Sequence, residues 1–295
     1  MFHGLSAFPI TPADPDGRVK TDELAGLVER LVAAKVDSIG LLGSTGSYMY
    51  LSREERKRAV AAAVEAVKGR TPIIVGAGAM RTDEVIRLAK DAEEAGADGL
   101  LLAPVSYTPL RDEEVFRHFA AVAGATGLPV CIYNNPSTTH FTFSDALIAR
   151  LAAVPKIAAV KNPGLPAAEI GPRHAALRAM VPAEFAIGYS GDWHASACLL
   201  AGGVGWYSVI GGLLPEPTLK LARAAAAGDR AEVERIEAAF APLWDLFKQA
   251  SSYRIVHAAA KRLGLASGDP PAPLLPPTAE EIARIEPALA ALRTV

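Results

Sequence analysis

Two short apolar runs in the sequence each end in a side chain that can react. One extends from Val130 to Tyr133 and the other from Ile157 to Lys161, and asparagine and then proline follow each run. Apolar runs of this length, closed by turn residues, are typical of strands buried in a parallel sheet. We therefore expect Lys161 to be the last residue of its strand, and we expect Pro136 to prevent the other strand from continuing.

A lysine at the end of a buried strand is unusual as a core residue, but its amine can act as a nucleophile. Partial removal from water favours the neutral amine, which is the nucleophilic form. Tyr133 lies one βα unit earlier, so the two strand ends are expected to be neighbours, and an amine beside a phenol can attack a ketone and move the protons. The pair favours an imine-forming enzyme. The alternatives are a lysine that keeps its charge in water and a tyrosine that only packs in the sheet.

Further polar residues follow other predicted strands. The turn from Gly43 to Ser47 offers backbone N–H groups and the hydroxyls of Ser44 and Thr45, which suits a small carboxylate. An ordinary strand-to-helix turn would have the same composition. Ser190 ends the seventh strand and Tyr107 follows the fourth, where Tyr107 could equally be a loop aromatic at an interface.

Eight strand-like runs alternate with helical patterns as far as Leu214. The runs are Leu5–Ile10, Ser38–Gly43, Pro72–Gly76, Gly99–Ala103, Pro129–Tyr133, Ile157–Lys161, Glu184–Tyr189 and Val204–Ile210. The helical patterns are Thr21–Ala34, Arg56–Lys68 behind a capping box at Ser52–Glu55, Thr82–Ala95, Asp112–Ala125 and Ser144–Leu151.

Eight alternations predict an α/β fold, a (βα)8 TIM barrel whose strand carboxyl ends carry the active site. A doubly wound sheet is the competing architecture. It needs a phosphate-binding glycine turn after the first strand, and the sequence Pro9-Ile10-Thr11-Pro12 is not one.

The strand patterns stop after Leu214, and the rest of the chain predicts a C-terminal helical extension. The expected elements are helices at Pro215–Ala227, Arg230–Phe247 and Ser251–Leu263, an extended connector at Asp269–Pro277 and a last helix from about Thr278. We assign residues 1–225 to the barrel with the active site. Residues 226–295 form a C-terminal helical region that packs on the barrel or on another subunit.

The composition excludes several classes of function. An apolar content of 51% supplies a core, and a net charge of −2 argues against a nucleic-acid or acidic-lipid surface. No apolar run is long enough to span a membrane and the N-terminus lacks a signal-peptide pattern, so we expect a cytoplasmic protein without membrane contact. Cys131 and Cys198 lie in apolar elements and are expected to be reduced. The six histidines show no metal-ligand spacing, so no metal is expected.

These motifs together resemble the dihydrodipicolinate synthase / N-acetylneuraminate lyase family of class I, pyruvate-type aldolases, over nearly the whole chain. The resemblance rests on Ala7–Pro12, Gly43–Gly46, Tyr133–Pro136, Val160–Lys161, Ser190–Asp192 and Pro273–Thr278. It implies a (βα)8 barrel with a helical C-terminal region. It also implies a homotetramer built as a dimer of dimers, and no cofactor beyond the covalent imine on Lys161.

The resemblance assigns a role to each matching position. Lys161 would form a Schiff base with pyruvate or another 2-keto acid, and Tyr133 would be the acid and base at the carbonyl. Ser44, where the synthases have threonine, and Thr45 would hold the carboxylate. Tyr107 would reach the site of the neighbouring subunit and relay protons through Ser44. The expected substrate-binding residues are Thr45, Gly46, Thr138, Ser190 and Tyr207.

One departure from the family pattern concerns the substrate. The synthases carry an arginine two residues after Pro136, whereas this chain has Thr138, which cannot make a bidentate, charged contact with a carboxylate. Tyr207 and the polar run from Thr138 to His140 suit a hydroxylated, sugar-acid-like substrate. We therefore expect a Schiff-base lyase that works by aldol cleavage or dehydration. The alternatives are a dihydrodipicolinate synthase, which joins pyruvate to aspartate semialdehyde, and a non-catalytic barrel that binds 2-keto acids.

Overall fold

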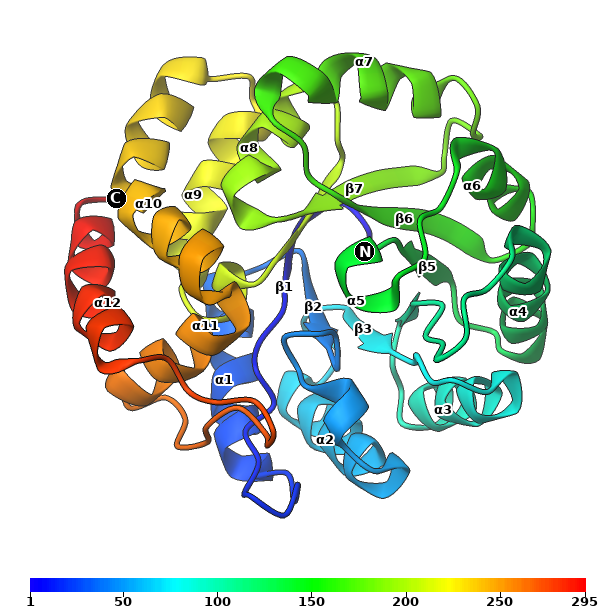
Figure 1. Cartoon of the computed structure of the whole chain (residues 1–295), viewed down its shortest axis with the longest axis horizontal. Coiled ribbons are helices and arrows are strands. Elements are labelled where there is room, and N and C mark those ends of the chain that lie inside the picture. Colours follow the sequence, from blue (N-terminus) through cyan, green and yellow to red (C-terminus); the bar gives the residue numbers. More distant parts are fainter.

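The computed structural model describes residues 1–295 and confirms the (βα)8 barrel (Figure 1). All neighbouring strands are parallel, they pair in the order of the sequence, and the last closes on the first. The strands are β1 (Gly4–Ala7), β2 (Ser38–Leu41), β3 (Ile73–Gly76), β4 (Gly99–Leu102), β5 (Val130–Tyr133), β6 (Ile157–Pro163), β7 (Ala186–Ser190) and β8 (Gly205–Ser208).

Helices form the outer ring around the strands in Figure 1. They are α1 (Thr21–Ala34), α2 (Arg53–Val67), α3 (Thr82–Glu94), α4 (Asp112–Ala125), α6 (Asp145–Ala152), α7 (Ala167–Arg178), α8 (Asp192–Leu200) and α9 (Pro215–Ala226). The one-turn helix α5 (Pro136–Thr139) lies inside this ring in Figure 1, and the chain also has short 3-10 turns at η1 (Tyr48–Tyr50) and η2 (Ile210–Gly212). No helix is long and apolar enough to cross a membrane.

The C-terminal helices predicted from the sequence lie along one side of the ring. They are α10 (Arg230–Ala250), α11 (Ser252–Arg262) and α12 (Ala279–Ala291), followed by η3 (Leu292–Thr294). Helix α10 packs against α9 on one flank and α12 on the other, so this region is continuous with the barrel wall (Figure 1). The division of the chain at residue 225 stays a prediction.

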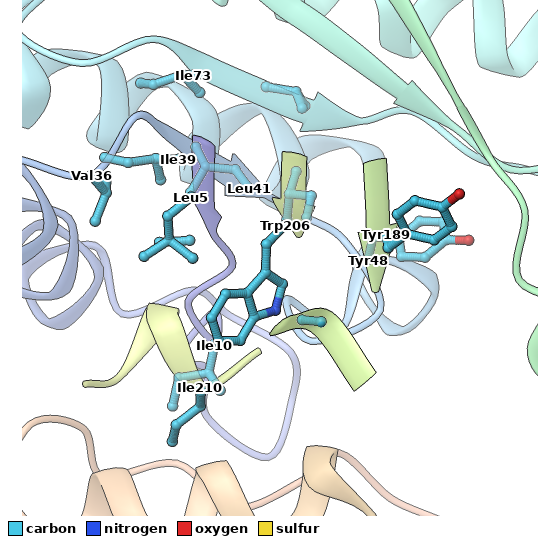
Figure 2. Close-up of a cluster of buried hydrophobic side chains, with 14 of the residues drawn as sticks. Leu5, Ile10, Val36, Ile39, Leu41, Tyr48, Ile73, Tyr189, Trp206 and Ile210 are labelled. Atoms are coloured by element: carbon cyan, nitrogen blue, oxygen red, sulfur yellow. The ribbon is translucent and has the colours of Figure 1, made fainter. Parts of the chain in front are cut away.

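Alternation along the strands divides the core into two layers. Successive side chains of a strand point to opposite faces. One set belongs to the large cluster that includes residues of the surrounding helices, and Leu5, Ile39 and Trp206 of this set are drawn in Figure 2. The other set fills the barrel interior and includes Phe8, Ile74, Leu101, Cys131, Tyr133, Ala159 and Tyr207. Lys161 has the same parity as Ala159, and this parity directs Lys161 inward.

Local details differ from the sequence predictions around the two reactive strands. Strand β6 continues two residues past Lys161, because Asn162 and Pro163 still pair with β7. Pro136 does more than prevent the strand from continuing. It is the first residue of the one-turn helix α5, a position at which its missing N–H is not needed. The prediction that Lys161 is the last residue of its strand is therefore wrong by two residues, whereas Tyr133 does end β5.

Two helix predictions also need correction. Only half of the capping box before α2 forms: Ser52 accepts the N–H of Glu55, but the Glu55 carboxylate accepts the N–H of Val19 at 2.7 Å instead of turning back. Helices α7 and α8 were not identified individually. Pro172 lies inside α7 and interrupts its pattern, and α8 is only 9 residues long.

Asp192, the first residue of α8, ties that helix to the end of β8. Its buried carboxylate accepts hydrogen bonds from Trp206 Nε1 at 2.9 Å and from the N–H groups of Val209 and Ile210 at 3.2 and 2.8 Å. Burial raises the pKa of this carboxyl, and the hydrogen bonds partly oppose the rise. The group therefore organises the chain directly after the last strand.

Replacing Asp192 with alanine should lower the free energy of unfolding by about 3 kcal/mol or more, because three buried donors lose their acceptor. Urea unfolding of the two proteins measures the difference. Asp192→Asn keeps one acceptor oxygen and should lose less. The control is Asp83→Ala, which removes an exposed partner of Arg81 and Arg87 and should cost less than about 1 kcal/mol. Equal losses in the two alanine variants would contradict the assignment.

Candidate active site

Lys161 lies in the barrel interior, directly beside Tyr133. The two residues are paired in register across β5 and β6, and their side chains are 5% and 6% exposed. The Lys161 Nζ lies over the Tyr133 ring at 4.1 Å and over the Phe8 ring at 4.2 Å from the centroids, with the Tyr207 ring at 5.7 Å. It makes no ion pair. The amine is thus enclosed by aromatic faces, with no carboxylate to hold it as an ammonium ion.

Glycines on neighbouring strands leave room for these rings. A Cβ at Gly40 would lie 2.2 Å from Phe8 Cζ, and a Cβ at Gly188 would lie 2.5 Å from Tyr207 Cε2. Gly188 is also the residue of β7 that pairs with Lys161. Any larger residue at either position would displace an aromatic ring from the amine.

The Tyr133 hydroxyl is held from two sides. It lies 3.2 Å from Ser44 Oγ, and Asn135 Nδ2 donates to it at 2.9 Å. A bond from an amide donor leaves the phenol proton free to point toward Ser44 or a substrate. The contact between Ser44 and Tyr133, which the sequence interpretation placed in one proton relay, is therefore present within a single chain.

The turn after β2 is set by close backbone packing. Leu42 has a φ of 54°. A Cβ at position 76 would lie only 1.8 Å from the Leu42 carbonyl oxygen, so only glycine fits at that position. The same turn brings Ser44 half-exposed into the site and buries Thr45 and Gly46. A Cβ at Gly46 would press on the Leu42 backbone at 2.9 Å, which explains the second glycine of the motif.

A cavity of about 460 Å³ opens above Ser44. Its other walls come from η1 and α5, with Val105 from the β4 loop, Tyr253 from α11 and Leu274 from the connector. Thr138, predicted to bind substrate, lies exposed on this wall beside Thr139. The volume is in the range of small-molecule sites.

Of the predicted site residues, only Ser44 and Thr138 line this cavity. Ser190 Oγ donates to the Asn162 carbonyl at 3.3 Å. The Tyr207 hydroxyl is fully buried and accepts from Cys131 Sγ at 3.5 Å, and burial raises the pKa of both groups, that of Cys131 to about 12. Tyr107 is 95% exposed and does not line the cavity of its own chain.

Several residues of the site were not identified from the sequence. Phe8 lies in a motif that was noted, but nothing in its type or spacing signals a ring under Lys161. Asn134 and Asn162 follow the two reactive residues, and their side chains join at 2.9 Å. Tyr253 donates to or accepts from Ser47 Oγ at 2.6 Å, across more than two hundred residues of sequence, and no local signal could have found it.

No group of three His, Cys, Asp or Glu side chains converges in the geometry of a metal site. The predicted reactive groups are the Lys161 amine, the Tyr133 phenol and the Ser44 hydroxyl. They suit imine formation and proton transfer.

The amide pair between Asn134 and Asn162 should hold the two reactive strands in place. Replacing either residue with alanine leaves a buried amide unpaired and should lower the free energy of unfolding by about 1–3 kcal/mol. The double variant should lose less than the sum, because the second change removes a group already without its partner. Combining Asn162→Ala with the distant Asp83→Ala should instead be additive. Additive losses in the amide pair would contradict the coupling.

Comparison with known proteins supports one family over the whole chain. A sequence model described as the dihydrodipicolinate synthetase family matches residues 1–292. A 4-hydroxy-tetrahydrodipicolinate synthase of Acidiphilium cryptum is 37% identical over 276 residues, which cover 94% of this chain and 93% of the relative.

Solved structures agree with this match. The crystal structure of a dihydrodipicolinate synthase from Agrobacterium tumefaciens superposes with a TM-score of 0.97 at 58% identity, over 99% of this chain and 98% of that one. A chloride-inhibited dihydrodipicolinate synthase from Acinetobacter baumannii, solved in complex with pyruvate, gives a TM-score of 0.91 at 29% identity over the full length of both. The chain belongs to the dihydrodipicolinate synthetase family, whose enzymes are class I Schiff-base lyases.

Proposed function

We propose that Lys161 attacks the carbonyl of pyruvate or of another 2-keto acid and that the resulting imine is the working intermediate. The observation that carries this proposal is the buried Lys161 amine, enclosed by aromatic rings and paired in register with Tyr133. The pyruvate complex of the Acinetobacter baumannii relative supports the choice of ligand.

The reaction follows from the chemistry of the imine. The amine adds to C2 of the keto acid, the carbonyl oxygen leaves as water, and the nitrogen becomes a protonated imine. This cation withdraws electrons, so C3 can lose a proton, lose a carbon substituent by aldol cleavage, or assist loss of a leaving group from the next carbon. The rings of Phe8 and Tyr133 present their negative faces to this positive charge.

Each surrounding residue has a role in this proposal. Tyr133 protonates the departing oxygen and later moves the proton at the bond that breaks. Ser44 and Thr45 bind the keto-acid carboxylate together with the N–H groups of the turn through Gly46. Tyr107 completes the relay in the neighbouring subunit of a homotetramer, in keeping with its 95% exposure in a single chain.

The remaining predictions concern the substrate and the cell. The outer part of the cavity carries Thr138, Thr139 and the rings of Tyr48, Tyr50 and Tyr253. Hydroxyl-bearing side chains support a hydroxylated, sugar-acid-like substrate. Ser190 and Tyr207 remain proposed substrate contacts. Each would reach the substrate either after its side chain moves or through its hydrogen-bond partner, which is Asn162 for Ser190 and Cys131 for Tyr207. The homotetramer and the cytoplasmic location stay predictions.

Dihydrodipicolinate synthase activity is the second candidate, because the curated relatives carry that name. The pyruvate half of the reaction would be the same. The difference lies at Thr138, which offers no charge to the carboxylate of aspartate semialdehyde. A barrel that binds 2-keto acids without turnover is the third reading.

Lys161→Ala should abolish covalent trapping of pyruvate. Borohydride reduces the imine to a stable secondary amine, and peptide mass spectrometry should locate one reduced pyruvate on Lys161 of the wild-type protein. Lys90→Ala, which changes an exposed lysine of α3, should retain the adduct. An adduct on another lysine, or none with any 2-keto acid, would refute Lys161 as the nucleophile.

Tyr133→Phe should slow proton removal from C3 far more than it weakens imine trapping. The exchange of pyruvate methyl protons in D2O, followed by NMR, reports this step without a second substrate. Loss of a positioned acid and base typically costs about 10²–10⁴ in rate. Tyr189→Phe, which alters a phenol bonded to His174, should leave exchange unchanged. Exchange at the wild-type rate in Tyr133→Phe would contradict the role of Tyr133 as acid and base. If the wild-type protein forms the trapped imine but does not exchange the methyl protons, the result would favour the non-catalytic barrel.

The synthase alternative can be tested by restoring the missing charge. In a coupled assay with pyruvate and aspartate semialdehyde, Thr138→Arg should raise kcat/KM roughly tenfold or more, the value of one charged hydrogen-bonded contact. Ser137→Arg, at the exposed neighbouring position, should have little effect. High wild-type activity that Thr138→Arg does not increase would make dihydrodipicolinate synthase the better assignment.

A further inference from the structure

Asn135 lies half-buried directly after β5, and its side chain does not cap the helix that follows it. Asparagine is among the residues that cap a helix best, because its side-chain oxygen can accept a backbone N–H of the first turn. Asn135 is the N-cap residue of α5, yet its side chain makes no such bond. The helix uses the backbone carbonyl of Asn135 instead, which accepts the N–H groups of Thr138 and Thr139 at 3.1 Å each. Helix capping therefore does not explain the amide at this position.

The amide is directed at the phenol of Tyr133. Asn135 Nδ2 donates to the phenol oxygen at 2.9 Å, and the other polar neighbour of that oxygen is Ser44 Oγ at 3.2 Å. The two hydroxyls can exchange the roles of donor and acceptor, whereas an amide nitrogen only donates. The contact with Asn135 therefore keeps the same direction whether Tyr133 is a phenol or a phenolate.

A permanent donor at this oxygen favours the ionised form of the phenol. A hydrogen bond to a charged acceptor is stronger than one to a neutral acceptor, so the bond from Asn135 strengthens when the proton leaves. Tyr133 is 6% exposed, and a phenolate so far removed from water needs such a bond. In the proposed reaction Tyr133 gives a proton to the departing oxygen and later accepts one at the bond that breaks, so it is a phenolate between these steps.

Four other titratable groups lie near this phenol. The Lys161 Nζ on β6 lies over the Tyr133 ring at 4.1 Å. Tyr48 approaches from η1, and Cys131 and Tyr207 belong to the same interior cluster as Tyr133. Burial raises the pKa of Tyr48, Cys131 and Tyr207, so these three groups carry no charge near neutral pH. Lys161 is unchanged when Asn135 is replaced, so a difference caused by the replacement reports the amide.

We propose that Asn135 is a positioning residue that stabilises the phenolate form of Tyr133 through Nδ2. The use of this phenolate in catalysis rests on the proposed function, because Asn135 acts on the reaction only through Tyr133. Without the donor, Tyr133 should give up its proton less readily and should serve as the base only at higher pH. Formation of the imine depends on the Lys161 amine and should be much less affected.

The exchange of pyruvate methyl protons in D2O, measured against pH on the full-length protein, tests the proposal. Asn135→Leu has nearly the same size as the wild-type residue but no donor. Its exchange rate at neutral pH should fall about tenfold, and the rising limb of the rate against pH should move up by about one unit, because a tenfold change in proton affinity is one unit of pH. Borohydride trapping of pyruvate should stay close to that of the wild type.

Gln249→Leu is the matched control. It makes the same change from an amide to an alkyl group on the exposed face of α10, where Gln249 accepts from Arg284 at 2.6 Å. Neither exchange nor trapping should change in this variant.

Asn135→Asp distinguishes a donor from a group that only fills space. It keeps the shape of asparagine but replaces the amide nitrogen with a carboxylate oxygen, whose charge opposes the phenolate. The rising limb should therefore move further in Asn135→Asp than in Asn135→Leu. If Asn135 only supported the fold by its shape, Asn135→Asp would instead stay close to the wild type. This variant also decides the question if Asn135→Leu does not fold.

A spectroscopic measurement keeps this test separate from the test of the proposed function. Protein labelled with carbon-13 at tyrosine Cζ gives a signal for each of the seven tyrosines, and the signal absent from Tyr133→Phe belongs to Tyr133. This signal moves downfield when the phenol ionises. Without any substrate, it should move at a pH about one unit higher in Asn135→Leu than in the wild type.

The two measurements have separate meanings. If the wild type neither traps nor exchanges pyruvate, the proposed function fails, and the tyrosine signal alone decides whether Asn135 stabilises the phenolate. Ionisation of Tyr133 at the wild-type pH in either Asn135 variant, or an exchange profile that either variant leaves unchanged, would overturn the proposal.

Discussion

The enclosure of the Lys161 amine by aromatic rings is the constraint on which the rest of the site depends. An amine taken out of water needs compensation, and a carboxylate would supply it only by fixing the charged, unreactive form. Ring faces at 4.1 and 4.2 Å from Nζ attract a cation by about 0.5–2 kcal/mol. The same faces can accept a protonated imine. The glycines at positions 40 and 188 are required because they make space for these rings.

The second constraint is the backbone around the turn after β2. The Leu42 carbonyl occupies the place of a Cβ at Gly76, and this contact fixes where Ser44 meets the Tyr133 hydroxyl. Tyr253 supports the turn from the far side through Ser47, so the C-terminal helices contribute directly to the active-site wall. The barrel supplies the reactive groups, whereas the appended helices help to shape the space above them.

Family membership and substrate choice rest on different parts of the molecule. Lys161 and Tyr133, the proposed imine-forming groups, lie on strands of a barrel that superposes on the Agrobacterium tumefaciens protein with a TM-score of 0.97. In the proposed reaction, recognition of a second substrate would depend on α5 and η1, short segments that line the cavity. Loops of this kind change without disturbing the barrel. Thr138 is such a change, and it can alter the partner of pyruvate while leaving the chemistry of Lys161 intact.

The sequence by itself determined the architecture and the adjacency of Lys161 and Tyr133. Eight continuous apolar runs separated by helical patterns can bury both faces only in a parallel sheet covered by helices, and the position of each residue along its strand fixes whether it points inward. Lys161 and Tyr133 could therefore be assigned from their places at the ends of consecutive runs. Strand and helix ends were predicted within a few residues, because glycine, proline and capping residues act locally.

Only the tertiary structure decided which groups surround that pair. The packing of Phe8 and Tyr207 beside Lys161 and the hydrogen bond between Tyr253 and Ser47 both link positions far apart in the chain. Such contacts depend on how strands and helices come together, and no local spacing records them. The capping box at Ser52 shows the same limit. The Glu55 carboxylate accepts a hydrogen bond from the distant Val19 N–H instead of from the N–H of Ser52. Local patterns specify elements, whereas the closing of the barrel selects the partners of each polar group.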